Sequence, residues 1–317
     1  MSEPLNIHVE AVAKAMADGH VIPLLGAGVN RGGRQPGVKW TFGASDCLPD
    51  GNELTEDLAA FFSYPSDAVK ELVRVSQYAA VTLGTGPLYD RLRAVFNVDY
   101  PPTPVHELLA RLPGSWRAKG HDPPRYQLIM TTNYDDALER AFVEQGEPFD
   151  LVTYVAQGKK SGKFLHRDPD GNVRVVTRSN QDPLSLEQRT IILKIHGALN
   201  RSNPKQDSFV ISEDNYIDYL SQVSVSNVMP VMLKEHMQDS HFLFLGYSMR
   251  DWNLRVFLRR ILDEQVFDYK WWSIQLKPDK LECEFWRKRG VDIYDVDLDK
   301  YVRLLQKALD RVPAAVR

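Results

Sequence analysis

The strongest constraint on the fold of this chain is a series of short runs that are largely apolar along their whole length. Such strands are buried on both faces, because a strand with one face in water alternates apolar and polar residues. The runs are VIPLL (21–25), YQLIMTTN (126–133), LVTYVA (151–156), TIILKIHG (190–197) and HFLFLGY (241–247). Helical patterns separate them, and this alternation predicts an α/β fold with a Rossmann-like, doubly wound and mainly parallel sheet.

The segments between these runs indicate how the chain is organised. Residues 31–51 are rich in Gly, Pro and polar residues and predict a loop. Three helices are expected between the first two strands, which indicates a helical module inserted at about residues 46–120 of a single domain spanning 1–317. The expected helices are 8–18, 52–63, 66–82, 103–112, 135–146, 250–262, 279–289 and 299–310, with two more within 213–237, and the other expected strands are WWSIQL, VDIYDV and a hairpin at 164–178.

The composition narrows the class of protein. Of 317 residues, 43% are hydrophobic and 26% charged, which is ordinary for a soluble globular protein. A net charge of -3 argues against nucleic acid as a direct partner, because phosphate binding needs a basic surface. Cys47 and Cys283 lie far apart, so no disulfide framework is expected. Residues 1–16 lack a signal-peptide pattern and the apolar runs are too short to span a bilayer, so we expect a cytoplasmic protein with no membrane partner.

Small and polar residues stand where four of the predicted strands end. In an open α/β sheet, ligands bind at the carboxyl ends of the strands, so these positions are the first candidates for a site. The four exits are Gly26-Ala27-Gly28-Val29-Asn30, Thr131-Thr132-Asn133-Tyr134-Asp135, His196-Gly197 and Gly246-Tyr247-Ser248. The occurrence of such residues at all four exits is stronger evidence for a ligand site than any single exit.

The glycine turn GAGVN follows the first strand directly. Glycines allow a tight turn and a close approach of the backbone to a pyrophosphate, and a helix beginning there would favour a phosphate. The turn is not a full GxGxxG pattern, because Arg31 occupies the sixth position. An ordinary tight turn after a buried strand is the alternative interpretation.

The other exits also allow two interpretations each. Asn133 could cap the helix that follows, with Asp135 and Asp136 in its first turn, or it could position a water or a ligand hydroxyl. His196 could be a satisfied core histidine or a general base, and the glycine after it would allow close approach of a ligand. Ser248 followed by Asp251 resembles a capping box at the start of a helix, which is compatible with a ribose or phosphate contact.

Taken in this order, the four motifs resemble the sirtuin family. The GAG turn, the T-x-N-x-D segment, the HG pair and the late G-x-S segment all have counterparts there. LPDGNEL, TTNYDDALERAF, LKIHG and FLGYSMRDWNLR are more similar to the bacterial sirtuin-like domains of anti-phage defence systems, and the similarity covers roughly residues 15–300. Two features depart from deacylase sirtuins: the four cysteines of a zinc ribbon are missing, and RGGRQPGVKW stands where deacylases have a GIPDFR-like stretch.

The resemblance implies NAD+ as a substrate, with no zinc or other bound metal. It implies hydrolysis of NAD+ to nicotinamide and ADP-ribose, as the toxic effector of an abortive-infection system. Asn133 would orient the water or ribose, His196 would accept a proton, and Asp135 would anchor the carboxamide. The residues expected to bind the dinucleotide are Gly26, Ala27, Gly28, Val29, Asn30, Thr132, Gly246, Tyr247 and Ser248.

Two other functions remain open on the sequence. An NAD-dependent protein deacylase would share every pocket residue, and a non-catalytic module could sense NAD or ADP-ribose. Because an uncontrolled NAD hydrolase would kill its own cell, the resemblance further implies control by homo-oligomerisation or by a partner that senses the trigger, such as an ATPase or an Argonaute-like subunit.

Overall fold

The computed structural model describes residues 3–121, 126–176, 184–221, 229–248 and 270–314. Its centre is a nine-stranded sheet in the order β11-β10-β9-β1-β2-β6-β3-β4-β5. Neighbouring strands are parallel from β11 to β3, and the β3–β4 and β4–β5 pairs are antiparallel. The strands are β1 (Val21–Leu25), β2 (Leu128–Thr131), β3 (Phe149–Tyr154), β4 (Phe164–Arg167), β5 (Val173–Val175), β6 (Thr190–Lys194), β9 (His241–Leu245), β10 (Trp271–Gln275) and β11 (Val291–Asp295). The prediction of a mainly parallel, Rossmann-like sheet is confirmed.

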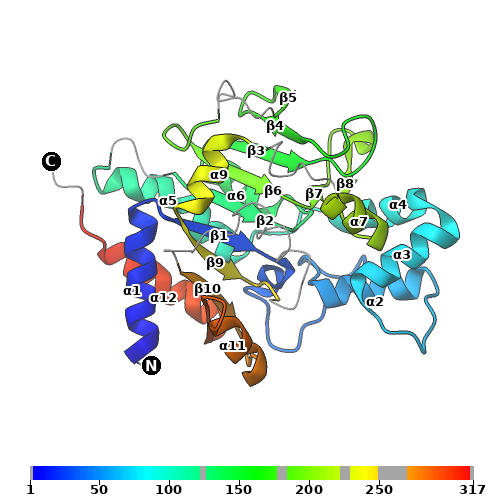
Figure 1. Cartoon of the computed structure of the whole chain (residues 1–317), viewed down its shortest axis with the longest axis horizontal. Helices are drawn as coiled ribbons and strands as arrows, with labels where there is room; N and C mark the ends of the chain where they lie inside the picture. Colours follow the sequence, from blue (N-terminus) through cyan, green and yellow to red (C-terminus); the bar gives the residue numbers. More distant parts are fainter. Residues whose placement is uncertain (1–2, 122–125, 177–183, 222–228, 249–269, 315–317) are drawn as a thin grey trace.

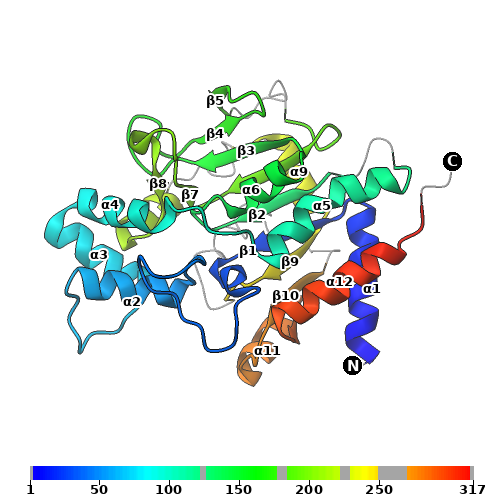
Figure 2. The same ribbon diagram turned by 180° about the vertical axis from the view of Figure 1, so that it is seen from behind.

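Helices cover both faces of the sheet, which explains why the central strands are apolar throughout. One face packs on α1 (Glu3–Ala17), α5 (Pro104–Ala118), α6 (Ala137–Glu144) and α12 (Leu298–Arg311), which lie in front of the sheet in Figure 2. The other face packs on α7 (Glu213–Ser221), α9 (Val231–Gln238) and α11 (Lys280–Arg287). In β1, for example, Val21 and Leu25 enter the first layer while Ile22 and Leu24 enter the second. The predicted hairpin is the antiparallel β4–β5 pair, and the helix expected at 250–262 lies outside the described residues.

Helices α2 (Gly51–Phe61), α3 (Leu72–Leu83) and α4 (Thr85–Phe96) form a layer of their own, which we call the helical cap. Figure 1 shows the cap beyond the carboxyl ends of β1 and β2. It has a separate apolar core that reaches Tyr134 and Phe209. Helix α5 packs on the sheet instead, and the extent of a module at residues 46–120 stays a prediction.

One helix of the cap was not predicted from the sequence. Three helices were expected between β1 and β2, whereas the structure has four, because α4 begins immediately after α3. The break between them is Gly84, whose φ of 87° turns the chain, and α4 then opens with Thr85, Gly86 and Pro87. Gly and Pro in sequence read as a loop, but Pro is well tolerated in the first turn of a helix.

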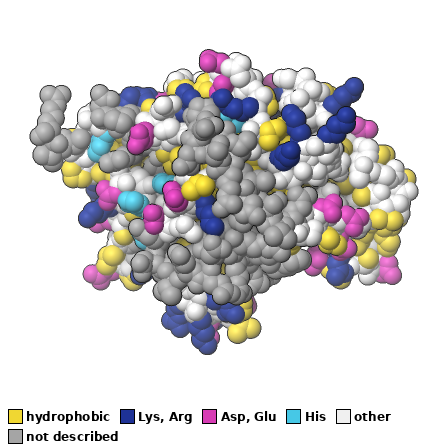
Figure 3. Space-filling view, turned by 45° about the horizontal axis from the view of Figure 1, so that its top comes forward, with side chains coloured by type: hydrophobic (Ala, Val, Ile, Leu, Met, Phe, Trp, Pro, Cys, Tyr) yellow, Lys and Arg dark blue, Asp and Glu magenta, His cyan; other side chains and the backbone are white. Residues whose placement is uncertain are grey.

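A two-stranded ribbon beside the sheet was also not predicted. It pairs β7 (Gly197–Ala198) with β8 (Ser208–Phe209), and the short turn η2 (Pro204–Gln206) lies between them. On the surface, Figure 3 shows basic and acidic side chains both scattered around the margin of the face it draws. None of the helices among the described residues is long and apolar enough to cross a membrane.

Candidate functional site

The last residues of four parallel strands lie side by side at one edge of the sheet. Leu25 of β1 is in register with Leu245 of β9 and Thr131 of β2, and Thr131 is in register with Lys194 of β6. The residues that follow these positions therefore emerge together. In the sheet, β1 lies between β2 on one side and β9 on the other, so the strand order changes direction at β1. Open α/β sheets bind ligands at the carboxyl ends of the strands next to such a change of direction.

A cavity of about 760 Å³ opens between this edge and the helical cap, within the size range of about 300–1,000 Å³ that is usual for ligand pockets. Ten of the twelve predicted site residues line it: Ala27, Gly28, Asn30, Thr132, Asn133, Asp135, His196, Gly246, Tyr247 and Ser248. The two exceptions, Gly26 and Val29, are not among the lining residues. Residues of all four motifs therefore lie around one cavity, as predicted from their positions at the ends of the strands.

The glycines of the first and last exits serve the contact between two pieces of backbone. The Gly28 amide donates to the Gly246 carbonyl at 2.8 Å, and the Gly26 amide donates to the Leu245 carbonyl at 3.0 Å. A Cβ on Gly28 would lie 2.6 Å from that carbonyl oxygen, and one on Gly246 would lie 2.2 Å from the Val29 nitrogen. These amides are already bonded within the protein, and the turn opens into a short 3-10 helix, η1 (Ala27–Arg31), rather than an α-helix.

Gly197 has a structural role that was not expected from the sequence. It was expected to allow close approach of a ligand beside His196. Its φ is 84°, and a Cβ there would lie 2.1 Å from the Ser208 carbonyl oxygen. The glycine therefore accommodates the tight β7–β8 ribbon, and the close approach of a ligand at this position stays a prediction.

Asn133 does not cap the helix that follows β2. Helix α6 begins at Ala137 with Asp136 at its N-cap position, so Asp135 and Asp136 precede the first turn rather than lying in it. The Asn133 side chain donates instead to the Gly26 carbonyl at 3.4 Å, and its amide donates to the Thr131 hydroxyl at 3.0 Å. Asn133 is 7% exposed and lines the cavity, which is compatible with the ligand-positioning hypothesis.

Two buried oxygen acceptors in the cavity wall have no hydrogen-bond partner among the described residues. They are Oδ1 of Asn30 and Oδ2 of Asp135. The other atom of each group is used: Asn30 Nδ2 donates to the Pro49 carbonyl at 3.0 Å, and Asp135 Oδ1 accepts from the Ala137 amide at 3.1 Å. Buried acceptors are normally satisfied. A ligand that brings hydroxyl or amide donors would meet this need at both places.

His196 is 3% exposed and lies between two tyrosines of α7. Its Nδ1 is 3.5 Å from the Tyr216 hydroxyl, and the rings of Tyr216 and Tyr219 meet the imidazole edge-on at 5.4 and 5.8 Å between centroids. Tyr216 also lines the cavity. The histidine is thus held in one orientation at the end of β6, as a group that accepts a proton at a fixed point must be.

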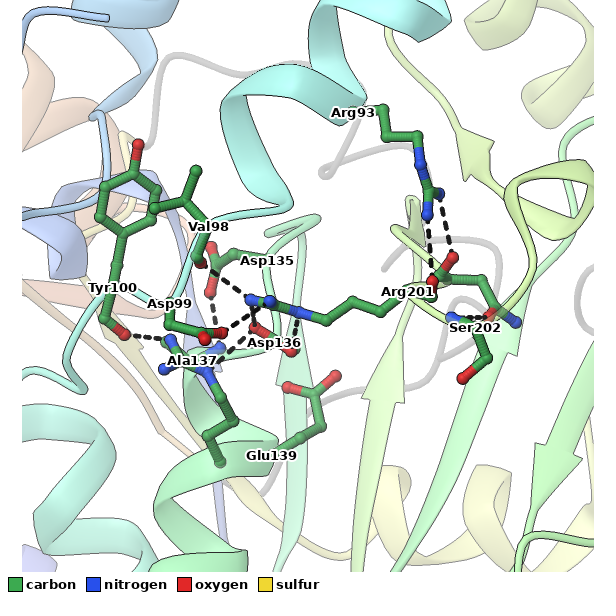
Figure 4. A network of polar contacts seen from close by, with 12 residues as sticks. Arg93, Val98, Asp99, Tyr100, Asp135, Asp136, Ala137, Glu139, Arg201 and Ser202 are labelled. Carbon is green, nitrogen blue, oxygen red and sulfur yellow. Dashed lines mark hydrogen bonds and ion pairs between the residues drawn. The ribbon is translucent and has the colours of Figure 1, made fainter. Parts of the chain in front are cut away.

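The loop that carries Asp135 is fixed from outside the cavity by the neighbouring Asp136. Arg201 donates to Asp136 at 2.9 Å and to Asp99 at 2.7 Å, and Arg140 donates to Asp136 at 3.2 Å and to the Tyr100 carbonyl. Figure 4 shows Arg201 reaching toward Asp136 and Asp99. The network joins the end of the helical cap to the start of α6, next to the candidate site.

The amino end of α2 forms a cavity wall that the sequence analysis did not identify. Asp50 caps this helix by accepting from the Glu53 amide at 2.8 Å, and Glu53 accepts from the Asp50 amide at 2.9 Å. Arg31 lies 3.7 Å from Asp50 at the rim. The D-x-x-E pattern of LPDGNEL, typical of a capping box, was the available signal. The further lining residues are Arg31, Pro49, Asp50, Gly51, Asn52, Leu54, Thr55, Lys70, Glu71, Leu72, Phe96, Tyr134 and Tyr216.

Ser248 was expected to begin a helix, and no bound metal was expected in the site. Ser248 is exposed at the cavity mouth, and its proposed capping partner Asp251 lies outside the described residues. Among the parts of the chain that the structure describes, no group of three or more His, Cys, Asp or Glu side chains is arranged to hold a metal ion.

Three curated bacterial proteins are similar to this chain. Defense-associated sirtuin 2 of Bacillus subtilis is 24% identical over 250 residues, which cover 75% of this chain and 20% of the relative. NAD(+) hydrolase ThsA of Acinetobacter baumannii (strain 532279) is 29% identical over 66% of this chain and 35% of the relative. NAD(+) hydrolase ThsA of Bacillus cereus (strain MSX-D12) is 26% identical over 63% and 34%. The matches therefore span between a fifth and about a third of the relatives' length.

A family model described as the SIR2-like domain matches residues 127–294, from the start of β2 to the end of the sheet. The matched segment includes Asn133, Asp135, His196 and Gly246, which all line the cavity. It covers more than half of the 317 residues, and the chain belongs to the SIR2-like domain family.

Proposed function

We propose that this chain is an NAD+ glycohydrolase, which cleaves NAD+ to nicotinamide and ADP-ribose. The observation that carries the proposal is the convergence of Asn133, Asp135 and His196 on one cavity at the carboxyl edge of a parallel sheet. The names of two relatives, both NAD(+) hydrolases, support the same reaction. The unpartnered acceptors of Asn30 and Asp135 fit a ligand that offers ribose hydroxyls and a carboxamide.

The reaction needs little acid chemistry from the protein. The pyridinium nitrogen of NAD+ is already cationic, so the electron pair of the breaking N-glycosidic bond neutralises it as nicotinamide leaves. The ribose carbon becomes oxocarbenium-like, as in glycoside hydrolysis, and a water oxygen then bonds to that carbon. The water loses a proton, and ADP-ribose results.

Each candidate residue has a place in this sequence. Asp135 accepts from the carboxamide N–H and so holds the nicotinamide end. Asn133, tied to the Gly26 carbonyl, orients the water or a ribose hydroxyl. His196 accepts the proton released by the water or by a ribose hydroxyl. The rest of the dinucleotide is held by the strand exits that line the cavity, at Ala27, Gly28, Thr132, Gly246, Tyr247 and Ser248.

The direct test is nicotinamide release from NAD+ by the purified protein and by Asn133→Ala and His196→Ala variants. Loss of a general base lowers the rate by about 10²–10⁴-fold, so His196→Ala should be inactive in a short assay. Asn133→Ala should also release nicotinamide more slowly, because the water or the ribose hydroxyl is no longer oriented. Asn97→Ala and His20→Ala are matched controls, since neither side chain lines the cavity. Wild-type release rates in both site variants would refute the assigned roles.

The same assay separates this function from its two rivals. A deacylase would release nicotinamide only when an acetylated peptide is added and would return a deacylated peptide. A sensing module would bind NAD+ and leave it intact after long incubation. The zinc-free prediction adds a further check: a chelator should leave nicotinamide release unchanged.

We further propose that the activity is the toxic step of a cytoplasmic anti-phage, abortive-infection system. The name of the Bacillus subtilis relative, a defense-associated sirtuin, supports this setting. Control by homo-oligomerisation or by a partner protein follows from the toxicity of unregulated NAD+ loss. Following cellular NAD+ during phage challenge, with and without neighbouring gene products, tests this, and an NAD+ level that never changes on infection would refute it.

A further inference from the structure

Lys194 is the last residue of β6, and its charged amine is enclosed by the protein. The side chain is 1% exposed and does not line the cavity. Its Nζ donates to Glu139 Oε1 at 2.8 Å and to the backbone carbonyl of Asp135. Burying a charged amine is unfavourable unless it is paired and hydrogen-bonded, so this placement needs a reason beyond filling space.

The two contacts join separate elements of the candidate site. Lys194 precedes His196 by two residues on β6, whereas Asp135 belongs to the loop after β2 and Glu139 to the first turn of α6. The amine therefore fixes the loop that carries Asp135 against the strand that carries His196. Arg201 also donates to Asp136 of the same loop at 2.9 Å, a contact drawn in Figure 4.

The Glu139 carboxylate accepts a hydrogen bond from the Lys194 amine through Oε1. Its side chain is 8% exposed, and its Oε2 has no hydrogen-bond partner among the described residues. Burial raises the pKa of Glu139, and the charge of Lys194 opposes that rise. A carboxylate with one free oxygen in the interior stays charged only beside its cation, so Lys194 and Glu139 act as one unit.

We propose that the buried Lys194–Glu139 pair is a positioning device that aims the Asp135 carboxylate at the carboxamide of bound NAD+. With its backbone carbonyl held by Lys194 and its Oδ1 held by the Ala137 amide, Asp135 has Oδ2 left to accept from a ligand. Lys194 does not touch the substrate in this scheme. The inference rests on the proposed function for the identity of the ligand.

The discriminating ligand pair is NAD+ and its deamido analogue, in which a carboxylate replaces the carboxamide. A well-placed Asp135 accepts from the carboxamide of the first and repels the carboxylate of the second. Hydrogen bonds to charged groups correspond to roughly 10- to 100-fold in affinity, so the wild-type protein should prefer NAD+ by about that factor. The preference reports the aim of Asp135 and not merely whether the protein is folded.

The variants must remove the pair without leaving a buried charge. Lys194→Met alone strands the Glu139 carboxylate and should lower the unfolding temperature by several degrees. Lys194→Met/Glu139→Met replaces both charges with apolar groups of similar volume and should recover most of that loss. Arg91→Met/Asp57→Met is the matched control, since this pair is also largely buried, at 11% exposure for each side chain, but lies within the helical cap.

The experiment measures binding of both dinucleotides by calorimetry, with nicotinamide release followed in parallel. The proposal predicts that the Lys194/Glu139 double variant loses about tenfold or more of the preference for NAD+ while the Arg91/Asp57 variant keeps it. An unchanged preference in the folded Lys194/Glu139 variant overturns the positioning role and leaves the proposed hydrolysis intact. A wild type that prefers NAD+ but never releases nicotinamide refutes hydrolysis and leaves the positioning role standing. A wild type without any preference overturns the positioning role.

Discussion

Replacing Gly246 with alanine tests the close contact between the ends of β1 and β9. Gly246 has a φ of 61°, in the left-handed region, where an alanine costs about 1–2 kcal/mol. The added Cβ would also lie 2.2 Å from the Val29 nitrogen and 2.6 Å from the Gly28 carbonyl carbon, both of them backbone atoms. Overpacking of this kind costs about 1–3 kcal/mol. The free energy of unfolding should therefore fall by about 2–5 kcal/mol.

Gly290→Ala is the matched control for this substitution. Gly290 has a φ of 79°, but no atom lies within 4 Å of the position of an added Cβ, so only the backbone term of about 1–2 kcal/mol applies. Urea unfolding of both variants, with unchanged m-values, gives the comparison. If Gly246→Ala is no more destabilising than Gly290→Ala, the two strand ends are not in the tight contact described. NAD+ affinity should also fall in Gly246→Ala, because the exits that form the cavity wall are pushed apart.

Two further predictions concern pH and the cavity wall. Burial lowers the pKa of His8 and His106 to about 4, so the unfolded chain binds these protons more tightly than the folded chain. The free energy of unfolding should therefore fall as the pH drops from about 6.5 to 4, by up to about 1.4 kcal/mol per pH unit for each histidine; a flat profile in urea unfolding would contradict this. Asp50→Ala should lower the stability by about 0.5–2 kcal/mol through loss of the α2 cap, whereas Asp50→Asn, which keeps an acceptor, should lose little. Equal losses for the two Asp50 variants in thermal unfolding would show that the cap contributes nothing.

Much of the fold is specified locally. The apolar runs became β1, β2, β3, β6 and β9, because strands buried on both faces must be apolar on both. Helix α4 escaped prediction, since Gly84, Gly86 and Pro87 are read locally as a loop. Whether a proline ends a helix or sits harmlessly in its first turn depends on where the preceding helix stops.

Part of the candidate site could likewise be predicted from the sequence, and part of it could not. Polar and glycine residues at strand ends could be recognised from the sequence, and parallel strands bring such ends to a shared edge. Ten of the predicted residues accordingly line one cavity. The amino end of α2 could not be assigned to that cavity, because nothing local indicates that a helix following a long loop folds back over the strand ends.

What the sequence determined by itself was the identity of the strands and of the residues at their exits, because burial dictates composition along each segment. Only the tertiary structure decided what those residues do. Gly28 and Gly246 are glycines because two distant backbones meet there, and Gly197 because β8 lies against it. Lys194 reads as an ordinary strand-end lysine, and its role follows from a carboxylate and a carbonyl supplied by α6 and the loop before it. Contacts between segments far apart in sequence leave no periodic pattern in that sequence, so the residues that form them can be identified only from the folded structure.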